Sequence, residues 1–212
     1  MRRWFLVIGL LNLAGSWLSM LTLPVQQIFL VHMIVHVTVI AVAAPLIALG
    51  VSRTRFDPVC VVPALFKPIP VSLLEFLVVW GWHAPALHHA ARQSLAVLLL
   101  EQISFLLVGL LLWLSVFGGA GPVRSARAAS GVIALLLTSM HMTLLGALLA
   151  LAPRALYEHG GGLFHLTPLE DQQLGGVIML LVGGIVYLSG GLYLLVQLLN
   201  SAPQSSNADF VT

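Results

Sequence analysis

The chain alternates between long apolar segments and short polar connections. Charged residues are absent or single in each apolar segment. Most segments have at least the roughly twenty residues that an α-helix needs to cross a hydrocarbon core about 30 Å thick. The pattern predicts an all-α polytopic membrane helix bundle, formed by one transmembrane domain over residues 1–200, with a disordered polar tail over 201–212. The six predicted transmembrane helices are 4–23, 28–50, 71–83, 93–117, 130–152 and 173–199.

Composition narrows the possible functions. The 212 residues are 59% hydrophobic and 8% charged, with a mean hydropathy of +1.04, whereas soluble domains carry about 25% charged residues. The net charge of +2 comes from 9 basic and 7 acidic residues, too few and too scattered for a nucleic-acid surface. The single cysteine, Cys60, excludes an internal disulfide and any CxxC metal motif. A bound metal would therefore need histidine, methionine, carboxylate or carbonyl ligands.

Basic residues fall unevenly on the two sides of the predicted bundle. If the N-terminus is cytoplasmic, only Arg92 and Arg154 face the exterior. The positive-inside rule then predicts that both termini are cytoplasmic and that the first, third and fifth loops are outside. The basic residues assigned to the cytoplasmic side are Arg2, Arg3, Arg53, Arg55, Lys67, Arg124 and Arg127.

The second predicted span contains two histidines in the motif HMxxH. His32 and His36 are four residues apart and so lie one turn apart on the same face of a helix, with Met33 about 100° away. Ionisable side chains are costly within a membrane and usually mark a functional site. The pair therefore predicts contact with a metal or cofactor. The alternative is a pair of packed histidines that bond to neighbouring helices.

The predicted orientation gathers further polar residues toward the outer side of the membrane. Glu101 is an expected hydrogen-bond acceptor for a metal-bound histidine, because a buried carboxylate needs a partner or a proton. Met33 and Met142 are possible thioether ligands or packing residues, and Asp171 is a possible helix cap. His88 and His89, beside Arg92, are predicted to lie in a solvated outer loop. The residues that complete this polar layer are His83, His141 and Gln172.

Several motifs in sequence order carry a family resemblance. They are HMxxH with the following APLIALG, then WHAPAL, ALYEH and LTPLEDQQLGGVIM, over about residues 19–187. Together they resemble the CtaG family of integral-membrane assembly factors for caa-type cytochrome c oxidase. The resemblance implies a bacterial cytoplasmic membrane protein that catalyses no reaction and helps deliver copper to the CuB centre of haem-copper oxidase subunit I.

The resemblance also implies site residues. His32, His36 and His83 match its motifs as metal ligands, and Asp171 and Gln172 match as well. His141 is added because its predicted depth is similar. One departure is Gln102, which stands where relatives often have a histidine after the glutamate.

Two other functions remain open at this stage. One is a b-type haem protein that transfers electrons, because imidazole does not distinguish copper from zinc or haem iron. The other is a structural assembly partner whose buried polar layer only specifies helix packing. Copper, as Cu(I), is expected ahead of haem, with a soluble copper donor on the outer side as a further partner. A hydrolase is not predicted, because the sequence has neither HExxH nor GxSxG.

Overall fold

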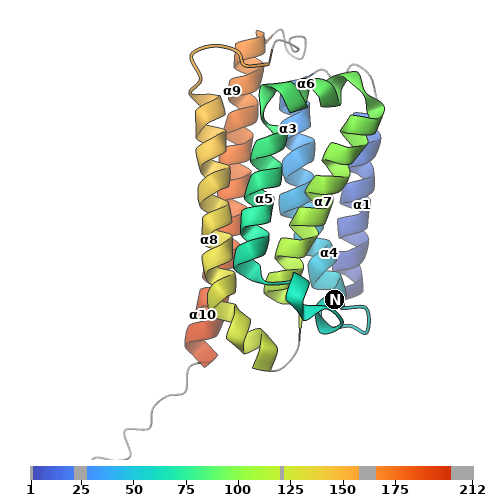
Figure 1. Ribbon diagram of the computed structural model, residues 1–212, viewed down its shortest axis with the longest axis vertical. Coiled ribbons are helices and arrows are strands. Elements are labelled where there is room, and N and C mark those ends of the chain that lie inside the picture. Colours follow the sequence, from blue (N-terminus) through green and yellow to red (C-terminus); the bar gives the residue numbers. More distant parts are fainter. Residues whose placement is uncertain (1, 22–27, 120–121, 158–165, 202–212) are drawn as a thin grey trace, which may run out of the picture.

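The computed structural model describes residues 2–21, 28–119, 122–157 and 166–201. Within these ranges the chain is all-helical, with 85% helix and no strand. Figure 1 shows the long helices running side by side along one axis. Five helical spans are long and apolar enough to cross a membrane, and a bent pair makes a sixth. The predicted all-α membrane bundle is therefore confirmed.

The helices follow the predicted spans closely. The first span is α1 (Arg2–Met20), the fourth is α7 (Leu95–Phe117) and the fifth is α8 (Pro122–Ala150). The second span joins α3 (Phe29–Val37), the π-helical turn η1 (Thr38–Ala43) and α4 (Ala44–Val51). The last joins α9 (Pro168–Ile178), a second π-helical turn η5 (Met179–Gly183) and α10 (Gly184–Ser201).

The third span differs from its prediction. It begins at Pro68 as α5 (Pro68–Trp82) and bends by 70° into the short helix α6 (Pro85–Gln93). The predicted solvated loop is wrong here, because Pro85 starts a helix at its first turn. His88 on this helix is buried at 5% exposure and His89 is partly buried.

The second span lies at the centre of the bundle, and α1 lies at its periphery. More than half of the second span is buried, against 11% of α1. In a π-helical turn the regular hydrogen-bond ladder is interrupted. The carbonyl of Ile40 in η1 accepts hydrogen bonds from Trp113 Nε1 at 3.0 Å and from the Tyr187 hydroxyl at 3.4 Å. These bonds tie the central span to α7 and α10.

Helices α8 and α9 pack with their backbones in contact. A Cβ added at Gly146 on α8 would lie 2.8 Å from the Gly176 oxygen of α9 and 2.6 Å from the Leu180 nitrogen of η5, and one at Gly176 would lie 2.6 Å from the Ala150 nitrogen. Small residues permit such close approach between membrane helices, where van der Waals packing drives association. The glycines therefore fix the distance between these two helices.

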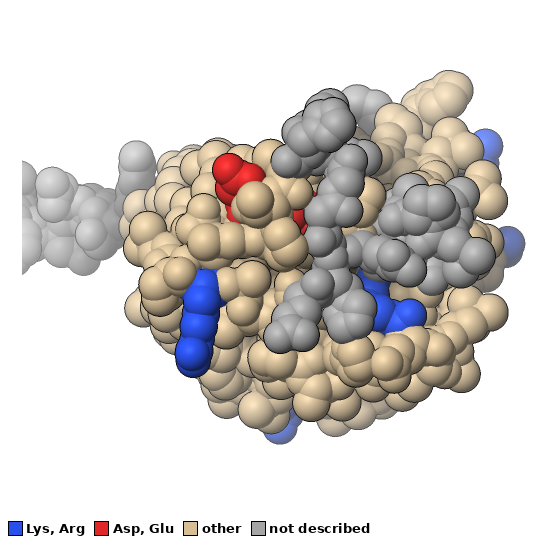
Figure 2. All heavy atoms as spheres, turned by 90° about the horizontal axis from the view of Figure 1, so that it is seen from above, with Lys and Arg blue, Asp and Glu red and all other residues tan. Residues whose placement is uncertain are grey.

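The first helix starts and α10 ends at the same end of the bundle, while α6 crosses the opposite end (Figure 1). This arrangement agrees with the predicted placement of both termini on one membrane side. In the view onto the α6 end, acidic side chains gather at one place and basic ones are scattered (Figure 2). The predicted disordered tail lies almost entirely beyond Ser201, outside the described residues.

Candidate metal centre

The centre starts from α3, which carries His32 and His36 on one face. The rings are stacked with centroids 6.3 Å apart, and the residues are 2% and 0% exposed. Helix α3 begins at Phe29 with no side-chain cap of its own. Instead Asp171 on α9 accepts hydrogen bonds from the backbone nitrogens of Phe29 at 2.8 Å and Leu30 at 3.2 Å. This carboxylate satisfies amides that a helix start leaves open, and so positions the histidines.

His83, at the end of α5, faces this pair. Its ring centroid lies 5.2 Å from that of His36 and 5.9 Å from that of His32. With metal–nitrogen bonds of roughly 2.0 Å and centroids ~1.1 Å beyond the nitrogen, imidazoles around one ion lie about 5.1–5.5 Å apart. The three ring centroids therefore lie within about an ångström of the spacing in a three-histidine centre. The rings would have to turn to bring their nitrogens together, because among the described residues the ligand atoms that lie within 4.8 Å of one another belong to His32, His88 and Glu101.

The hydrogen bonds of these rings leave nitrogen atoms available. His83 Nδ1 donates to the Val79 carbonyl at 2.6 Å, so Nε2 keeps its lone pair. This Nε2 and both ring nitrogens of His36 are buried without a hydrogen-bond partner among the described residues. Buried polar atoms are rarely left unpaired, since each costs about 1–3 kcal/mol. A metal ion bound to His83 Nε2 and to the unprotonated nitrogen of His36 would remove the cost for these two atoms.

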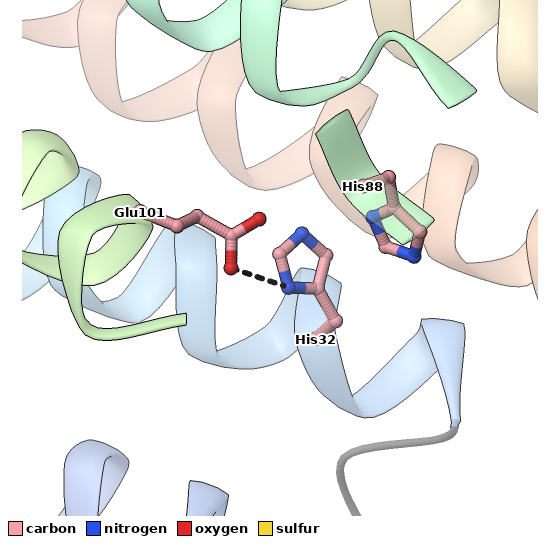
Figure 3. A group of neighbouring side chains, drawn as sticks. All are labelled: His32, His88 and Glu101. Atoms are coloured by element: carbon pink, nitrogen blue, oxygen red, sulfur yellow. Dashed lines mark ion pairs between the residues drawn. The ribbon is translucent and has the colours of Figure 1, made fainter. Parts of the chain in front are cut away.

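A second group of ligands meets the first at His32. His88 from α6 and Glu101 from α7 point toward the His32 ring (Figure 3). One ligand atom from each of the three residues lies within 4.8 Å of the others. The His32 and His88 rings meet edge to face at 5.0 Å. We call His32, His36, His83 and His88 the histidine cluster, and His32 is the member shared by both groups.

Glu101 is fully buried and has one neutralising partner. Its Oε2 accepts from Arg92 Nη2 at 2.6 Å and from Gln102 Nε2 at 3.3 Å. Its Oε1 is without a hydrogen-bond partner in the described part of the chain. The same Arg92 nitrogen lies 3.2 Å from His32 Nδ1. Because a guanidinium can only donate, His32 Nδ1 is the acceptor and is not protonated in this structure.

Aromatic side chains enclose the cluster. Phe105 meets His36 edge to face at 4.2 Å, and Phe29 stacks on Tyr157 at 4.5 Å. The Tyr157 hydroxyl donates to the His83 carbonyl at 2.6 Å, and its ring lies 4.4 Å from that of His88. Burial raises the pKa of this phenol, so it stays protonated as a donor. These rings exclude water from the cluster, and apolar surroundings of this kind strengthen interactions with an ion.

His141 on α8 lies at the border of the cluster. It is 8% exposed, and its ring meets Phe76 edge to face at 5.4 Å. Both its ring nitrogens are buried without a hydrogen-bond partner among the residues described here. The structure thus brings His141 near the predicted ligands, on the side of His36, and metal binding by it stays a prediction.

The remaining predicted site residues make contacts elsewhere. A Cβ at Gly175 would lie 2.9 Å from Met33 Cγ, and one at Gly183 would lie 3.3 Å from Met142 Cβ. Both methionines thus pack on the last span. Gln172 accepts from the Leu156 nitrogen at 2.7 Å and donates to the Leu149 carbonyl at 3.3 Å. Together with the Asp171 bonds, these contacts order the frame around the cluster.

Sequence reasoning missed His88, Arg92 and Tyr157. His88 and Arg92 are four residues apart, and Pro85 followed by alanines is typical of a helix start. That spacing could have shown that both share one helix face. Nothing in the sequence around Tyr157, apart from its place in the ALYEH motif, indicates that it lies beside the cluster.

Comparison with known proteins gives one family. Residues 1–201 match the family described as cytochrome c oxidase caa3 assembly factor. The searches of curated proteins and of solved structures gave no match.

Proposed function

Because the chain belongs to the family of cytochrome c oxidase caa3 assembly factors, we propose that it binds copper as a cargo in the histidine cluster. From there the ion passes to the CuB centre of haem-copper oxidase subunit I. The protein acts in the bacterial cytoplasmic membrane and catalyses no reaction of its own. A soluble copper donor on the outer side supplies the ion.

One observation carries this proposal: imidazole nitrogens are buried in a cluster without partners that would use their lone pairs. Among the described residues neither ring nitrogen of His36 has a partner, so the one that carries no proton keeps its lone pair, and His83 offers Nε2. Packing alone gives no reason to leave these atoms unsatisfied. The Val79 carbonyl that fixes the His83 ring is a typical orienting partner of a metal-bound histidine.

The ligand set suits a metal that is held and then released. Neutral imidazoles bind copper in either oxidation state. The one cysteine, Cys60, is exposed in the segment between α4 and α5, so thiolate does not enter the cluster. Ligand exchange can therefore move the ion from one set of imidazoles to another. The α6 end of the bundle is the end predicted to face the exterior, which agrees with loading from that side.

The test is metal binding by the purified full-length protein, with Cu(I) added without oxygen and competed by a chelator. We expect about one copper per chain in the wild type and a loss of affinity of at least about tenfold in His36→Ala. The matched control is His89→Ala, because His89 is partly buried on the same helix α6 and its ring bonds to Gln93. It should bind copper as the wild type does.

The same samples test the alternatives. A haem absorption band in the visible spectrum of the purified protein would show that it binds haem rather than copper. A wild type that binds no copper, or a His36→Ala variant with affinity equal to that of His89→Ala, would contradict the proposal and favour a structural role for the histidines.

A further inference from the structure

The cluster already contains a cation. The side chain of Arg92 is 4% exposed, and its Nη2 reaches both Glu101 Oε2 at 2.6 Å and His32 Nδ1 at 3.2 Å. It thus contacts the two groups that a metal at this position would need, one carboxylate oxygen and one imidazole lone pair.

The space for a metal and the space taken by the guanidinium coincide. Glu101 Oε2 and His32 Nδ1 are 3.8 Å apart, the pair joined by the dashed line in Figure 3. An ion bound to both at roughly 2.0–2.2 Å would sit between them, since twice this bond length exceeds their separation. Arg92 Nη2 lies close to both atoms. An ion and the guanidinium cannot occupy this position together.

We propose that Arg92 is a resident counter-cation that an incoming metal ion displaces, so that the guanidinium and the metal compete for Glu101 and His32. The inference rests on the proposed copper binding and assigns a role to a residue outside the predicted ligand set. When the guanidinium leaves, His88 remains one turn away on the same helix. Its ring then completes the group with His32 and Glu101.

Once the guanidinium has left, the single charge of Glu101 sets the charge balance with the bound ion. Glu101 and Arg92 together are neutral in the buried site. Replacement of the guanidinium by Cu(I) keeps the site neutral, whereas replacement by Zn²⁺ leaves one positive charge in a medium where uncompensated charge is costly. The long arginine side chain can move its head group to the membrane surface while its stem stays against apolar neighbours. Helix α6 lies at the end of the bundle (Figure 1), so the path to that surface is short.

The experiment measures Cu(I) and Zn²⁺ affinities of the full-length protein by chelator competition for the wild type, Arg92→Gln and Arg92→Lys. Arg154→Gln is the control, because Arg154 is an exposed arginine outside the cluster. We expect Arg92→Gln to tighten Cu(I) and Zn²⁺ binding by a similar factor, about tenfold, because the guanidinium must leave Glu101 and His32 before either ion binds. Arg92→Lys keeps the charge and should lie between the wild type and Arg92→Gln. Arg154→Gln should match the wild type for both ions.

Glu101→Gln makes the test specific. It should weaken Cu(I) binding by about 10- to 100-fold, and Arg92→Gln added to it should no longer tighten binding, since the carboxylate is gone. If the wild type binds copper and Arg92→Gln binds it equally or more weakly, Arg92 is a structural residue and this inference alone is wrong. If Arg92→Gln does not fold, unchanged affinities in Arg92→Lys overturn it. A wild type that binds no copper overturns both this inference and the proposed function.

Discussion

Within the cluster, the decisive residues are those that are buried and yet keep a lone pair available. His36 is fully buried without a partner for either ring nitrogen in the described chain, and His83 is oriented by one bond to a carbonyl. Met33 and Met142 are equally buried but pack on glycines of the last span. Burial alone therefore does not identify the ligands. The ligands are identified by the direction of each side chain and by its hydrogen bonds.

At the residue scale, the account predicts that His32 and His36 act jointly. Single changes to alanine should each lower Cu(I) affinity by at least about tenfold, and the double change should cost little more than either single change, because ligands of one ion are coupled. The measurement is chelator competition on the purified variants, with thermal unfolding to show that each is folded. Independent, additive losses would instead place the two histidines in separate interactions.

At the element scale, the structure depends on how closely helices approach. The α8–α9 contact has glycine on both sides, whereas α1 is exposed over most of its length. A larger side chain would therefore meet backbone atoms at the α8–α9 contact but nothing within 4 Å at Gly15 on α1. This difference offers a matched pair of substitutions.

Gly146→Ala should destabilise the folded protein by about 1–3 kcal/mol, because the new Cβ meets the backbone at Leu180 and overpacks the contact. Gly15→Ala on α1 is the control, since a Cβ there meets nothing within 4 Å. It should be neutral or slightly stabilising, because alanine favours a helix over glycine. Thermal unfolding in one detergent compares the two. Equal stability of both variants would mean that the close α8–α9 contact is absent in the membrane protein.

Among the helices, the long spans were predictable from the sequence and the short helix α6 was not. Long apolar segments predicted the spans because a membrane helix must be long and apolar whatever it packs against. Helix α6 was missed because Pro85–Gln93 is short and polar, and resembles a loop by hydropathy. The pair His32 and His36 was predictable from its spacing. The meeting of His32 with His88 and Glu101 depends on the 70° bend, which the local sequence does not encode.

The cap on α3 shows a second limit. Asp171 bonds to Phe29, and the two residues are 142 positions apart in the chain. The sequence near Phe29 contains no sign of that partner, and Asp171 itself looked like a cap for its own helix. Its helix is instead capped by Thr167, which forms a capping box with Glu170. Tertiary capping of this kind needs the three-dimensional arrangement.

At the scale of the whole molecule, the account requires one orientation in the membrane. Reporter fusions after Gly121 and after Ser205 should report the cytoplasm, and a fusion after Gly161 should report the exterior, because the predicted topology places seven basic residues on one side and two on the other. Alkaline phosphatase and a fluorescent protein report opposite sides and control each other. A reversed pattern would place α6 and the cluster toward the cytoplasm and contradict loading from outside.

The central claim is that imidazoles of the histidine cluster hold copper. X-ray absorption at the copper edge of the Cu(I)-loaded protein tests it directly, since nitrogen and sulfur ligands give different distances and imidazole rings give characteristic outer-shell scattering. The account predicts a low-coordinate Cu(I) centre with two or more imidazoles and no sulfur, and loss of an imidazole contribution in His36→Ala. A sulfur ligand, or a spectrum unchanged by His36→Ala, would contradict it.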